Sequence, residues 1–545
     1  RTPSTMASVP RLRPYDPTPN LGLGPDRFRM IAPNGFGDGH NSFPHSVAWY
    51  RGRVYVGTTR SNFQMIKIQH TFKNMPVPLW PVEGPDDAEG LYRDLDRRAQ
   101  IWAFDPKTGE WEMVHVAPEV PAIGGHFGMV ARETGFRSMA VFQGESDPEP
   151  ALYAATWAVS RSPGALLLRS QDGVQFHPVS PFGIIEGLPV TATRVLIPFK
   201  GRLFTSPTGT RGFDVKFVIN VSGNPVIYES RDPANGDWVP VNEPGFGNPE
   251  NEGVLMLCEF QDRLYATTFN NNGFEVWCSD CEGNPPYKWE KVLDKGGGRG
   301  GENQIGVTMR TFKGALYIGT AIQNGGNDLN NKIGPAGSEV IRINADHTWD
   351  LIIGEARYTD QGKKIPLSGV AAGFGNVFNG YFWAMTEHDG WLYVGSMNST
   401  IWVRFLNSDA YNPGIRSVVG RVGAEAIVDN EAGCALWRTA DGENWMPVTK
   451  VGFDNRYNLG IRNLLSTPHG LAVAVANPFG PRVAVRAEDD SWHYTDNPRG
   501  GCEMWFGRFW EQDPPDHPLR RCADRVGQQL AAYRGDATAW FGGDE

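Results

Sequence analysis

The chain has 545 residues, a net charge of −10 and a hydrophobic fraction of 40%. The acidic balance argues against a general nucleic-acid binder, which needs a basic surface, and no apolar run reaches the roughly 20 residues of a membrane-spanning helix. Sixty-five glycines, 41 prolines and 18 tryptophans favour many short strands joined by turns around an ample core, and not disorder.

The N-terminal 20 residues contain no apolar segment of the kind that signal peptides carry. Six cysteines are ordinary for a cytoplasmic protein of this length and few for a disulfide scaffold. We therefore expect a cytoplasmic protein, with a processed, exported form as the open alternative. Pairing of Cys278 with Cys281, or of Cys502 with Cys522, also stays open.

One hairpin pattern recurs along the chain: an apolar strand, a tight turn, and a second strand that often reads LYVG. It appears as VAWYRGRVYVGT at 47–58 and again as AMTEHDGWLYVGS at 384–396. Internal repetition of this kind is typical of propellers and solenoids. The seven hairpins that match lie at 47–58, 139–156, 195–206, 256–268, 308–320, 384–396 and 463–477.

Six outer hairpins follow the inner ones in register. Several contain a turn of the form S/T-x-D-G-x-x-aromatic, clearest at 170–176 and 439–445, and this turn resembles the Asp-box of sialidase-like propellers. An aspartate at this place caps the backbone of its own turn. We predict that Asp172 and Asp441 are structural and take no part in catalysis.

The last inner hairpin lacks an outer hairpin, and the missing strand is expected from the other end of the chain. Residues 28–46 align with 238–256 and with 445–463, so the N-terminal segment should form the outermost strand of the last sheet, beside a third strand at 500–508. Closure of this kind covers open sheet edges. The predicted fold is all-β, a seven-bladed β-propeller closed by the N-terminal strand.

The predicted division of the chain is an N-terminal extension at 1–26, the propeller at 27–508 and a C-terminal helical tail at 509–545. Three insertions follow second strands, at 63–100, 401–432 and 478–499, with a short helix expected near 86–98. Loops after second strands share a face with the connectors between blades. The insertions should therefore cap that face, where binding groups usually sit.

Each inner strand has a mouth position, about seven residues before its turn. These positions hold His45, Arg137, Arg194, Leu255, Val307, Trp383 and Arg462. Guanidinium groups that face one axis repel one another unless an anion, a carboxylate or solvent offsets them. We expect an anionic or polar ligand at this mouth; the alternative is pairing with Glu133, Glu252 or Glu302.

Aromatic and amide side chains accompany the mouth positions, and one asparagine recurs four residues before them. Asparagine suits tight connectors, so a structural role is the alternative for that series. Tyr381 or His45 could act as acid or base. The predicted catalytic residues are Tyr381, His45, Arg137 and Arg60, and the predicted substrate-binding residues are Arg194, Arg462, Trp383, Phe43, Asn41, Asn379 and Asn398. Arg211 and Gln323 are expected in the loops of the same face.

No metal site or cofactor is predicted. The CSDC segment at 278–281 is a lone CxxC without the second pair that a structural zinc site needs, and no nucleotide-binding or haem motif is present. A structural calcium ion stays open.

The strands GRVYVGT and NGYFWAM, with outer strands such as GFEVW, resemble a broad group of bacterial propellers. Among those with assigned chemistry they are similar to the propeller of the cyanobacterial alkylating enzymes that build cylindrocyclophanes, which join a resorcinol ring to an alkyl chloride; related enzymes esterify carboxylates. The resemblance implies an arginine and a tyrosine that stabilise the departing anion and orient the phenol. By their place at the mouth, Arg60 or Arg137 would correspond to this arginine and Tyr381 to this tyrosine.

The function predicted is a small-molecule enzyme of specialised metabolism that uses polar or acid–base catalysis, with C–C or C–O bond formation favoured over redox chemistry. Two alternatives stay open: a non-catalytic propeller that binds glycans or a protein, and a sialidase-like hydrolase, which also needs a Tyr–Glu pair and an aspartic acid. A covered channel favours the enzyme, because a flat partner surface gains nothing from a cap.

Overall fold

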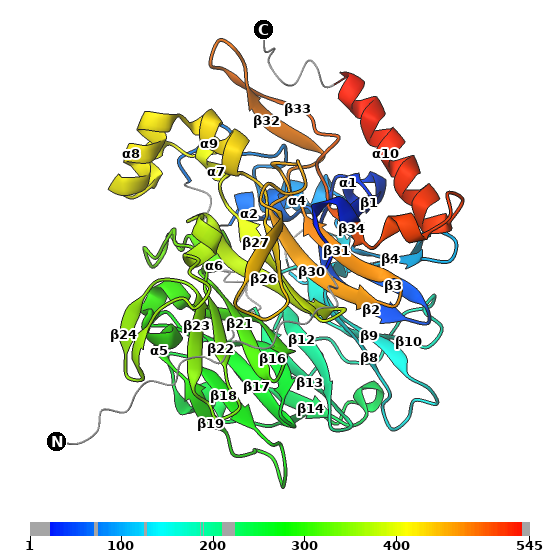
Figure 1. The fold of residues 1–545 in the computed structure, drawn as a ribbon. Helices are drawn as coiled ribbons and strands as arrows, with labels where there is room; N and C mark the ends of the chain where they lie inside the picture. The colour runs from blue at the N-terminus through cyan, green and yellow to red at the C-terminus, as the bar shows by residue number, and fades with distance from the viewer. Residues whose placement is uncertain are drawn as a thin grey trace, which may run out of the picture.

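The computed structural model of this chain describes residues 22–69, 75–124, 128–185, 187–188, 190–209 and 224–536. These residues are mostly β, in two large antiparallel sheets and three short hairpins (Figure 1). No described helix combines the length and the apolar character that crossing a bilayer requires.

The large sheets consist of four-stranded antiparallel units. In chain order these are β2 (Asn41–Tyr50), β3 (Arg53–Arg60), β4 (Gln100–Asp105) and β5 (Glu110–Val116); β8 (Glu133–Phe142), β9 (Ala151–Ala158), β10 (Leu167–Ser170) and β11 (His177–Pro178); β12 (Ala192–Phe199), β13 (Arg202–Thr208), β14 (Tyr228–Ser230) and β15 (Val239–Pro240); β16 (Gly253–Phe260), β17 (Arg263–Phe269), β18 (Val276–Ser279) and β19 (Glu290–Leu293); β20 (Ile305–Phe312), β21 (Ala315–Ala321), β22 (Val340–Ile343) and β23 (Trp349–Ile353); β26 (Asn379–His388), β27 (Trp391–Asn398), β28 (Leu436–Thr439) and β29 (Trp445–Thr449); and β30 (Gly460–Thr467), β31 (Gly470–Ala476), β34 (Glu503–Gly507) and β1 (Phe28–Ala32).

The innermost strands of successive units pack against one another. Strand β2 contacts β8, the contacts continue through β12, β16, β20 and β26 to β30, and β30 contacts β2 in turn. The hydrogen-bonded ladders are not continuous around this circuit, because one large sheet runs from β1 to β19 and the other from β15 to β5. Outside these ladders, the backbone amide of Asn477 donates a hydrogen bond to the backbone carbonyl of Ser42 at 2.9 Å.

The N-terminal strand lies where the sequence predicts it. Strand β1 pairs antiparallel with β34, with Phe28 opposite Gly507 and Met30 opposite Trp505. Ile31, only 2% exposed, shares a core with Val54 of the first unit and with helix α10 (Pro518–Asp536) of the C-terminal tail, which lies against β1 (Figure 1). Strand β1 and helix α10 are thus packed together beside the first unit.

The connectors that lead into β2, β16, β26 and β30 share one conformation. Before β26, Gly373 and Phe374 both have left-handed backbone, with φ of 64° and 54°, and the Phe374 ring stacks on Trp437 with centroids 4.3 Å apart. A left-handed phenylalanine is strained, so its contacts must hold the turn in place. The same stacked turn recurs as Phe36 with Trp102, Phe246 with Trp277 and Phe453 with Trp505.

An asparagine fastens each of these turns to the sheet. Asn379 donates to the Gly373 carbonyl and accepts from Asn398 and Ser396, each at 2.9 Å. Asn41, Asn251, Asn303 and Asn458 make the equivalent bond to the turn glycine. The side-chain amides of these asparagines therefore serve as hydrogen-bond donors to the backbone carbonyls of the connectors.

The three insertions meet in one hydrophobic cluster on one side of the units (Figure 1). The first contributes α2 (Asn62–Lys67) and α4 (Ala88–Arg93), within the predicted helical stretch. The second contributes α7 (Trp402–Phe405), α8 (Pro413–Val422) and α9 (Ala424–Glu431), and the third the hairpin β32 (Arg482–Arg486) and β33 (Trp492–Asp496). Phe63, Phe405 and Phe479, one from each insertion, are all buried in this cluster, as expected for segments that share a face.

The remaining short elements are connectors and surface hairpins: η1 (Pro25–Arg27), α1 (Asn34–Gly37), β6 (Glu119–Pro121), β7 (Met129–Ala131), η2 (Pro233–Asn235), η3 (Pro244–Gly247), α5 (Lys295–Gly298), η4 (Gly300–Asn303), α6 (Gln323–Gly326), β24 (Arg357–Thr359), β25 (Gly362–Lys364), η5 (Ala372–Gly375), η6 (Ser408–Ala410) and η7 (Trp510–Gln512).

The two aspartate turns have the predicted structural role. Asp172 accepts from the backbone amides of Val174 and Gln175, both at 2.8 Å, and these bonds lower its pKa. Asp441 accepts from two amides of its own turn in the same way. All six cysteines are unpaired, so neither open disulfide forms.

Replacing Ile31 by alanine should destabilise the protein by about 2–4 kcal/mol, because the deleted methyl and methylene groups leave a cavity where β1 meets α10 and the first unit. The matched control is Arg29→Gln on the same strand, whose exposed pair with Asp524 should matter by no more than about 1 kcal/mol. Thermal unfolding of both variants measures the difference. Equal midpoints would show that β1 does not hold α10 to the first unit.

Candidate functional site

Every innermost strand bulges at its mouth position. The ladders skip His45, Arg137, Leu255, Val307, Trp383 and Arg462, and in β12 they skip both Arg194 and Val195. A bulge leaves a residue unpaired and re-aims its side chain. All seven mouth residues line one cavity of about 170 Å³ between the innermost strands, so the structure brings the predicted set together.

Around this cavity the mouth residues are sorted by chemistry. Arg462, His45, Arg137 and Arg194 come from β30, β2, β8 and β12, which are successive neighbours. We call these four residues the basic arc. Leu255, Val307 and Trp383, from β16, β20 and β26, form the apolar arc opposite it. One side of the mouth thus offers cations and the other offers apolar surface.

A second pocket, also of about 170 Å³, lies between the arcs and the insertions. Its inner end consists of the basic arc with Phe43, Trp157, Tyr381 and Trp383, and its outer wall includes Phe63 and Ile66 of α2 and Trp402 of α7. The first and second insertions therefore line this pocket, and no residue of the third insertion is part of its described lining. The basic arc and Trp383 line both this capped pocket and the cavity beneath it.

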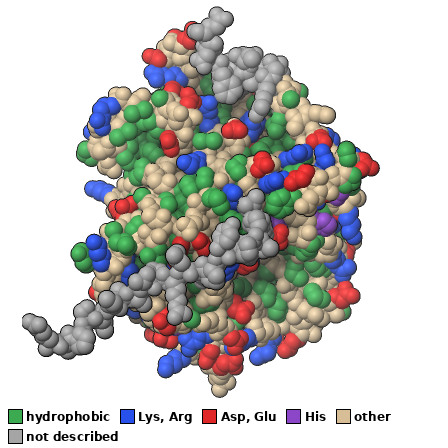
Figure 2. All heavy atoms as spheres, in the orientation of Figure 1, with side chains coloured by type: hydrophobic (Ala, Val, Ile, Leu, Met, Phe, Trp, Pro, Cys, Tyr) green, Lys and Arg blue, Asp and Glu red, His purple; other side chains and the backbone are tan. Residues whose placement is uncertain are grey.

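The cations of the basic arc are desolvated and repel one another. Burial, reinforced by Arg194 and Arg462, holds the pKa of Arg137 well below its usual range. Burial and then Arg194 lower the pKa of Arg462 to about 9. On the face seen in Figure 2, by contrast, acidic and basic side chains are interspersed. A bound anion would relieve the repulsion within the arc.

His45 is a buried, neutral imidazole at neutral pH. Burial is the main cause of its strongly lowered pKa, and Arg462, Arg137 and Arg194 lower it further. Its Nδ1 lies 2.7 Å from Thr59 Oγ1, which fixes the ring and leaves Nε2 as the nitrogen available to a ligand. A neutral histidine so placed can accept a proton.

Aromatic rings hold the basic arc in place. The Arg137 guanidinium lies 5.4 Å from the Trp157 ring centroid, and Arg462 lies 5.1 Å from that of Trp383. Phe43 meets both Trp383 and His45 edge-on, and Tyr381 lies with its ring centroid 5.9 Å from that of Trp383. Such cation–π contacts compensate in part for the lost hydration of the arginines.

The acids that could have paired with the arc are engaged elsewhere or lie outside the pocket. Glu133 is bound by Arg132 at 2.6 Å, and Glu302 pairs with Arg299 at 3.3 Å. Burial and then Asp328 raise the pKa of Glu252. Among the described residues, the lining of the capped pocket includes no aspartate and no glutamate.

Four predicted site residues lie away from the pocket. Asn41, Asn379 and Asn398 belong to the connector bonds described above. Arg60 takes the place of Asn398 in the first unit: it donates to Asn41 Oδ1 at 2.9 Å and pairs with Asp38 at 2.8 Å. Arg211 lies outside the described residues.

Sequence reasoning missed the aromatic residues that complete the pocket, chiefly Trp157, Phe63 and Trp402. Trp157 lies near the end of a second strand, one residue before the register of Arg60 and Asn398, so the repeat came close to it without selecting it. Phe63 and Trp402 lie in the insertions, whose packing no repeat predicts.

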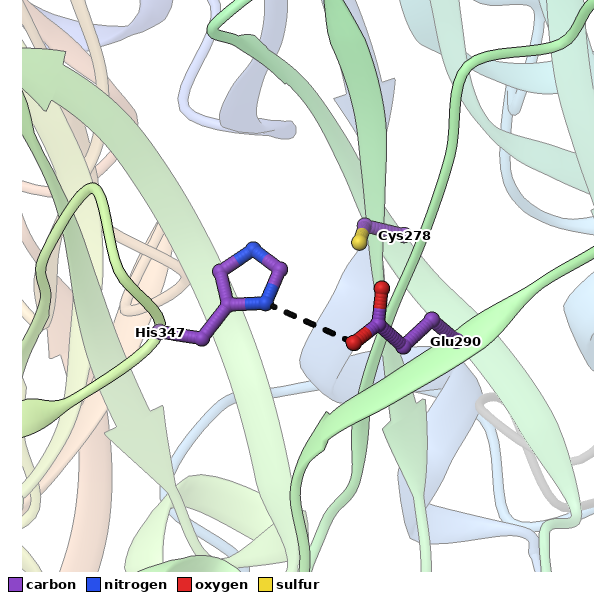
Figure 3. Close-up of side chains that lie close together, drawn as sticks. All are labelled: Cys278, Glu290 and His347. Carbon is purple, nitrogen blue, oxygen red and sulfur yellow. Dashed lines mark ion pairs between the residues drawn. The ribbon is translucent and has the colours of Figure 1, made fainter.

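A separate cluster of side chains could hold a metal. Cys278, Glu290 and His347 converge at the outer edge of two neighbouring units (Figure 3), and their ligand atoms all lie within 4.8 Å of one another.

No protein-family model and no curated protein matches this chain. Among solved structures, it is similar to the GH93 α-L-arabinofuranosidase of Fusarium graminearum (9% identity over 68% of this chain and 92% of that one, TM-score 0.34) and to virginiamycin B lyase from Staphylococcus aureus (8% identity, 68% and 94%, TM-score 0.34). A 6-phosphogluconolactonase-like protein from Bacteroides fragilis matches with 12% identity, 76% and 95% coverage, and a TM-score of 0.30. The chain spans half the length of a prolyl endopeptidase that it also matches, with 11% identity over 86% of this chain and a TM-score of 0.33. These neighbours have propeller-type folds, and the low similarity transfers none of their activities.

Replacing Arg137 by glutamine should raise the pKa of His45 towards 6.5, because it removes a nearby cation that opposes protonation. Carbon-edited NMR of the histidine Cε1–H signals measures this, with His45→Gln as the assignment. The control Arg310→Gln, at an exposed position of an inner strand, should leave the pKa unchanged. A wild-type His45 that titrates at 6.5 or above would contradict the electrostatics.

Replacing Asn379 by alanine should cost about 1–3 kcal/mol of stability, since the Gly373 carbonyl and two donors lose their partner. Affinity for any ligand of the capped pocket should not change once the variant is folded. Asn430→Ala on the exposed face of α9 is the control and should change stability by less than about 0.5 kcal/mol. Loss of ligand affinity with unchanged stability would instead place Asn379 in the binding site.

Proposed function

We propose that the four-stranded units are the seven blades of one propeller, closed by β1, and that the protein is an enzyme acting on a small organic molecule at the capped mouth. The observation that carries this proposal is the sorting of the mouth residues into a basic arc and an apolar arc beneath an aromatic pocket. The substrate that fits is an amphipathic molecule, with an anionic or carbonyl group and an aromatic or alkyl body.

Binding would draw on both halves of the site. The anionic group would lie against Arg137, Arg194 and Arg462, whose mutual repulsion it offsets and for which a charge-assisted bond is worth about twice a neutral one. The body would bury apolar surface against Trp383, Phe63 and Trp402, at about 25 cal/mol per Å². Neither arc alone selects such a molecule, and the two together exclude neutral polar ligands.

The chemistry proposed is proton transfer with charge stabilisation. His45 would take the proton of a phenol or hydroxyl group through Nε2, and the oxygen or ring carbon so activated would form the new bond. The group displaced would leave as an anion towards the basic arc, whose donors are already in place. Binding of an anionic substrate raises the pKa of His45, because it offsets the cations that keep the ring neutral.

The cavity beneath the arc supports access from two sides. Because the basic arc lines this cavity and the capped pocket, water or a small departing anion can reach the guanidinium groups without passing the organic substrate. Ser138, Thr308 and Asn463 make its walls partly polar. Alkylation, cyclisation and acyl transfer all fit this arrangement. A sialidase-like mechanism fits less well, because the described pocket lining offers no carboxylate.

The binding half of the proposal is tested with an alkyl or aryl sulfonate or carboxylate in isothermal titration calorimetry. Arg194→Gln and Arg462→Gln should each weaken binding about 10- to 100-fold, because each removes a desolvated charge from the anion's partners. The exposed Arg310→Gln should bind like the wild type. Equal affinities for all four proteins would overturn the assignment of the pocket.

The catalytic half is tested by incubating ligands that bind with an activated partner, such as an alkyl halide or an activated ester, and detecting covalent products by mass spectrometry. His45→Gln should keep binding and lose turnover. Ligands that bind tightly and are returned unchanged by the wild type would favour the binding propeller over the enzyme.

A further inference from the structure

The Cys278, Glu290 and His347 cluster is built from three separate chain segments. Cys278 lies on β18 and Glu290 on the neighbouring β19, while His347 projects from the β22–β23 turn of the next unit. Figure 3 shows the thiol, the carboxylate and the imidazole pointing towards a common point. The cluster thus bridges two units, at the edge of the hydrophobic core that they share.

The histidine is oriented for a ligand. His347 has left-handed backbone, with φ of 65°, which a residue other than glycine adopts at a cost. The Tyr265 hydroxyl lies 2.8 Å from its Nε2, so Nδ1 is the nitrogen that faces Glu290, at 3.8 Å from Oε1. An imidazole that binds metal through one nitrogen is usually held by a hydrogen bond at the other.

The spacing suits a tetrahedral ion. With bonds of about 2.0–2.3 Å, two ligand atoms of a zinc site lie roughly 3.3–3.8 Å apart. The distance of 3.8 Å from His347 Nδ1 to Glu290 Oε1 already lies at the upper end of this range. All three pairs of ligand atoms lie within 4.8 Å of each other, so only small side-chain movements would bring them to zinc-binding distances. The Glu290 side chain is 59% exposed, which gives an ion a path from solvent.

A cation already occupies part of the cluster. Arg263 Nη1 lies 3.4 Å from Cys278 Sγ and 3.4 Å from Glu290 Oε2. Its side chain is 37% exposed, so the guanidinium can swing out to solvent. The cluster therefore attracts positive charge, and Arg263 is the competitor that an entering metal must displace.

We propose that Cys278, Glu290 and His347 form a binding site for a thiophilic divalent cation such as Zn²⁺, with water in the fourth position. Thiolate, imidazole and carboxylate together are ligands that zinc accepts and that magnesium and calcium do not favour. On binding, the thiol proton passes to solvent and Arg263 moves away. The ion would link β18 and β19 to the β22–β23 turn and stabilise the outer contact between their units.

The test uses Co²⁺ added to the full chain, with sulfur-to-cobalt charge-transfer absorbance and thermal unfolding as readouts. The wild type should develop the absorbance at one equivalent and unfold at a higher temperature. Cys278→Ser should lose the absorbance, and Cys281→Ser, a buried thiol three residues away outside the cluster, should keep it. Absorbance that survives in Cys278→Ser, or none in the wild type, would overturn the proposal.

Two further variants cover the case in which Cys278→Ser does not fold. His347→Gln should weaken cobalt binding at least tenfold, and Arg263→Gln should tighten it, because the competing cation is gone. A purely structural role for the cluster predicts that Arg263→Gln lowers stability with no gain in metal affinity. Both readouts are independent of the capped pocket, so this proposal and the proposed function can fail separately.

Discussion

The site depends on one backbone device, the β-bulge at the mouth position of each innermost strand. In an unbroken ladder, alternate residues point to opposite faces of a sheet, and a side chain near the mouth would lie between neighbouring units. The bulge turns that residue to the cavity instead. Because the bulge recurs in every innermost strand, the residue placed there in each unit can vary freely in chemistry while its position stays fixed. Four successive innermost strands place a basic residue at this position and the other three place an apolar residue there, so the mouth has a basic side and an apolar side.

The bulges in turn need rigid connectors, since each lies only a few residues after a chain reversal. In the connectors before β2, β16, β26 and β30, a stacked phenylalanine and an asparagine supply that rigidity. The Phe374 ring stacks on Trp437, which holds the turn against β28, and Asn379 of β26 donates a hydrogen bond to the turn backbone. A strained left-handed phenylalanine is tolerated because both contacts hold it. The repeat that reads most clearly along the chain is therefore structural, and the variable residue beside it carries the chemistry.

This division explains what could be predicted from the sequence. Hairpins, the N-terminal strand and the convergence of Arg137, Arg194 and Arg462 follow from the repeat, because equivalent positions in equivalent units occupy equivalent places. The same logic overreaches at Arg60 and Asn379, which share the mouth by alignment but point into the connector bonds. Alignment gives a position along a strand and not the direction of its side chain. Insertions carry no repeat, so Phe63 and Trp402 could be placed only by their packing.

The basic arc is an arrangement that stability alone would not retain. One buried guanidinium group (Arg137), two half-buried ones (Arg194 and Arg462) and a buried imidazole cost desolvation energy, and their repulsion adds to it. Replacing them with apolar residues of similar size would remove both costs. Cation–π contacts with Trp157 and Trp383 offset only a part. Under the proposed function, an anion that binds there would recover part of this cost, so a ligand that carries a negative charge, or develops one during reaction, would be preferred over its neutral form. The same unfavourable term would then provide both selectivity for anions and stabilisation of a departing one.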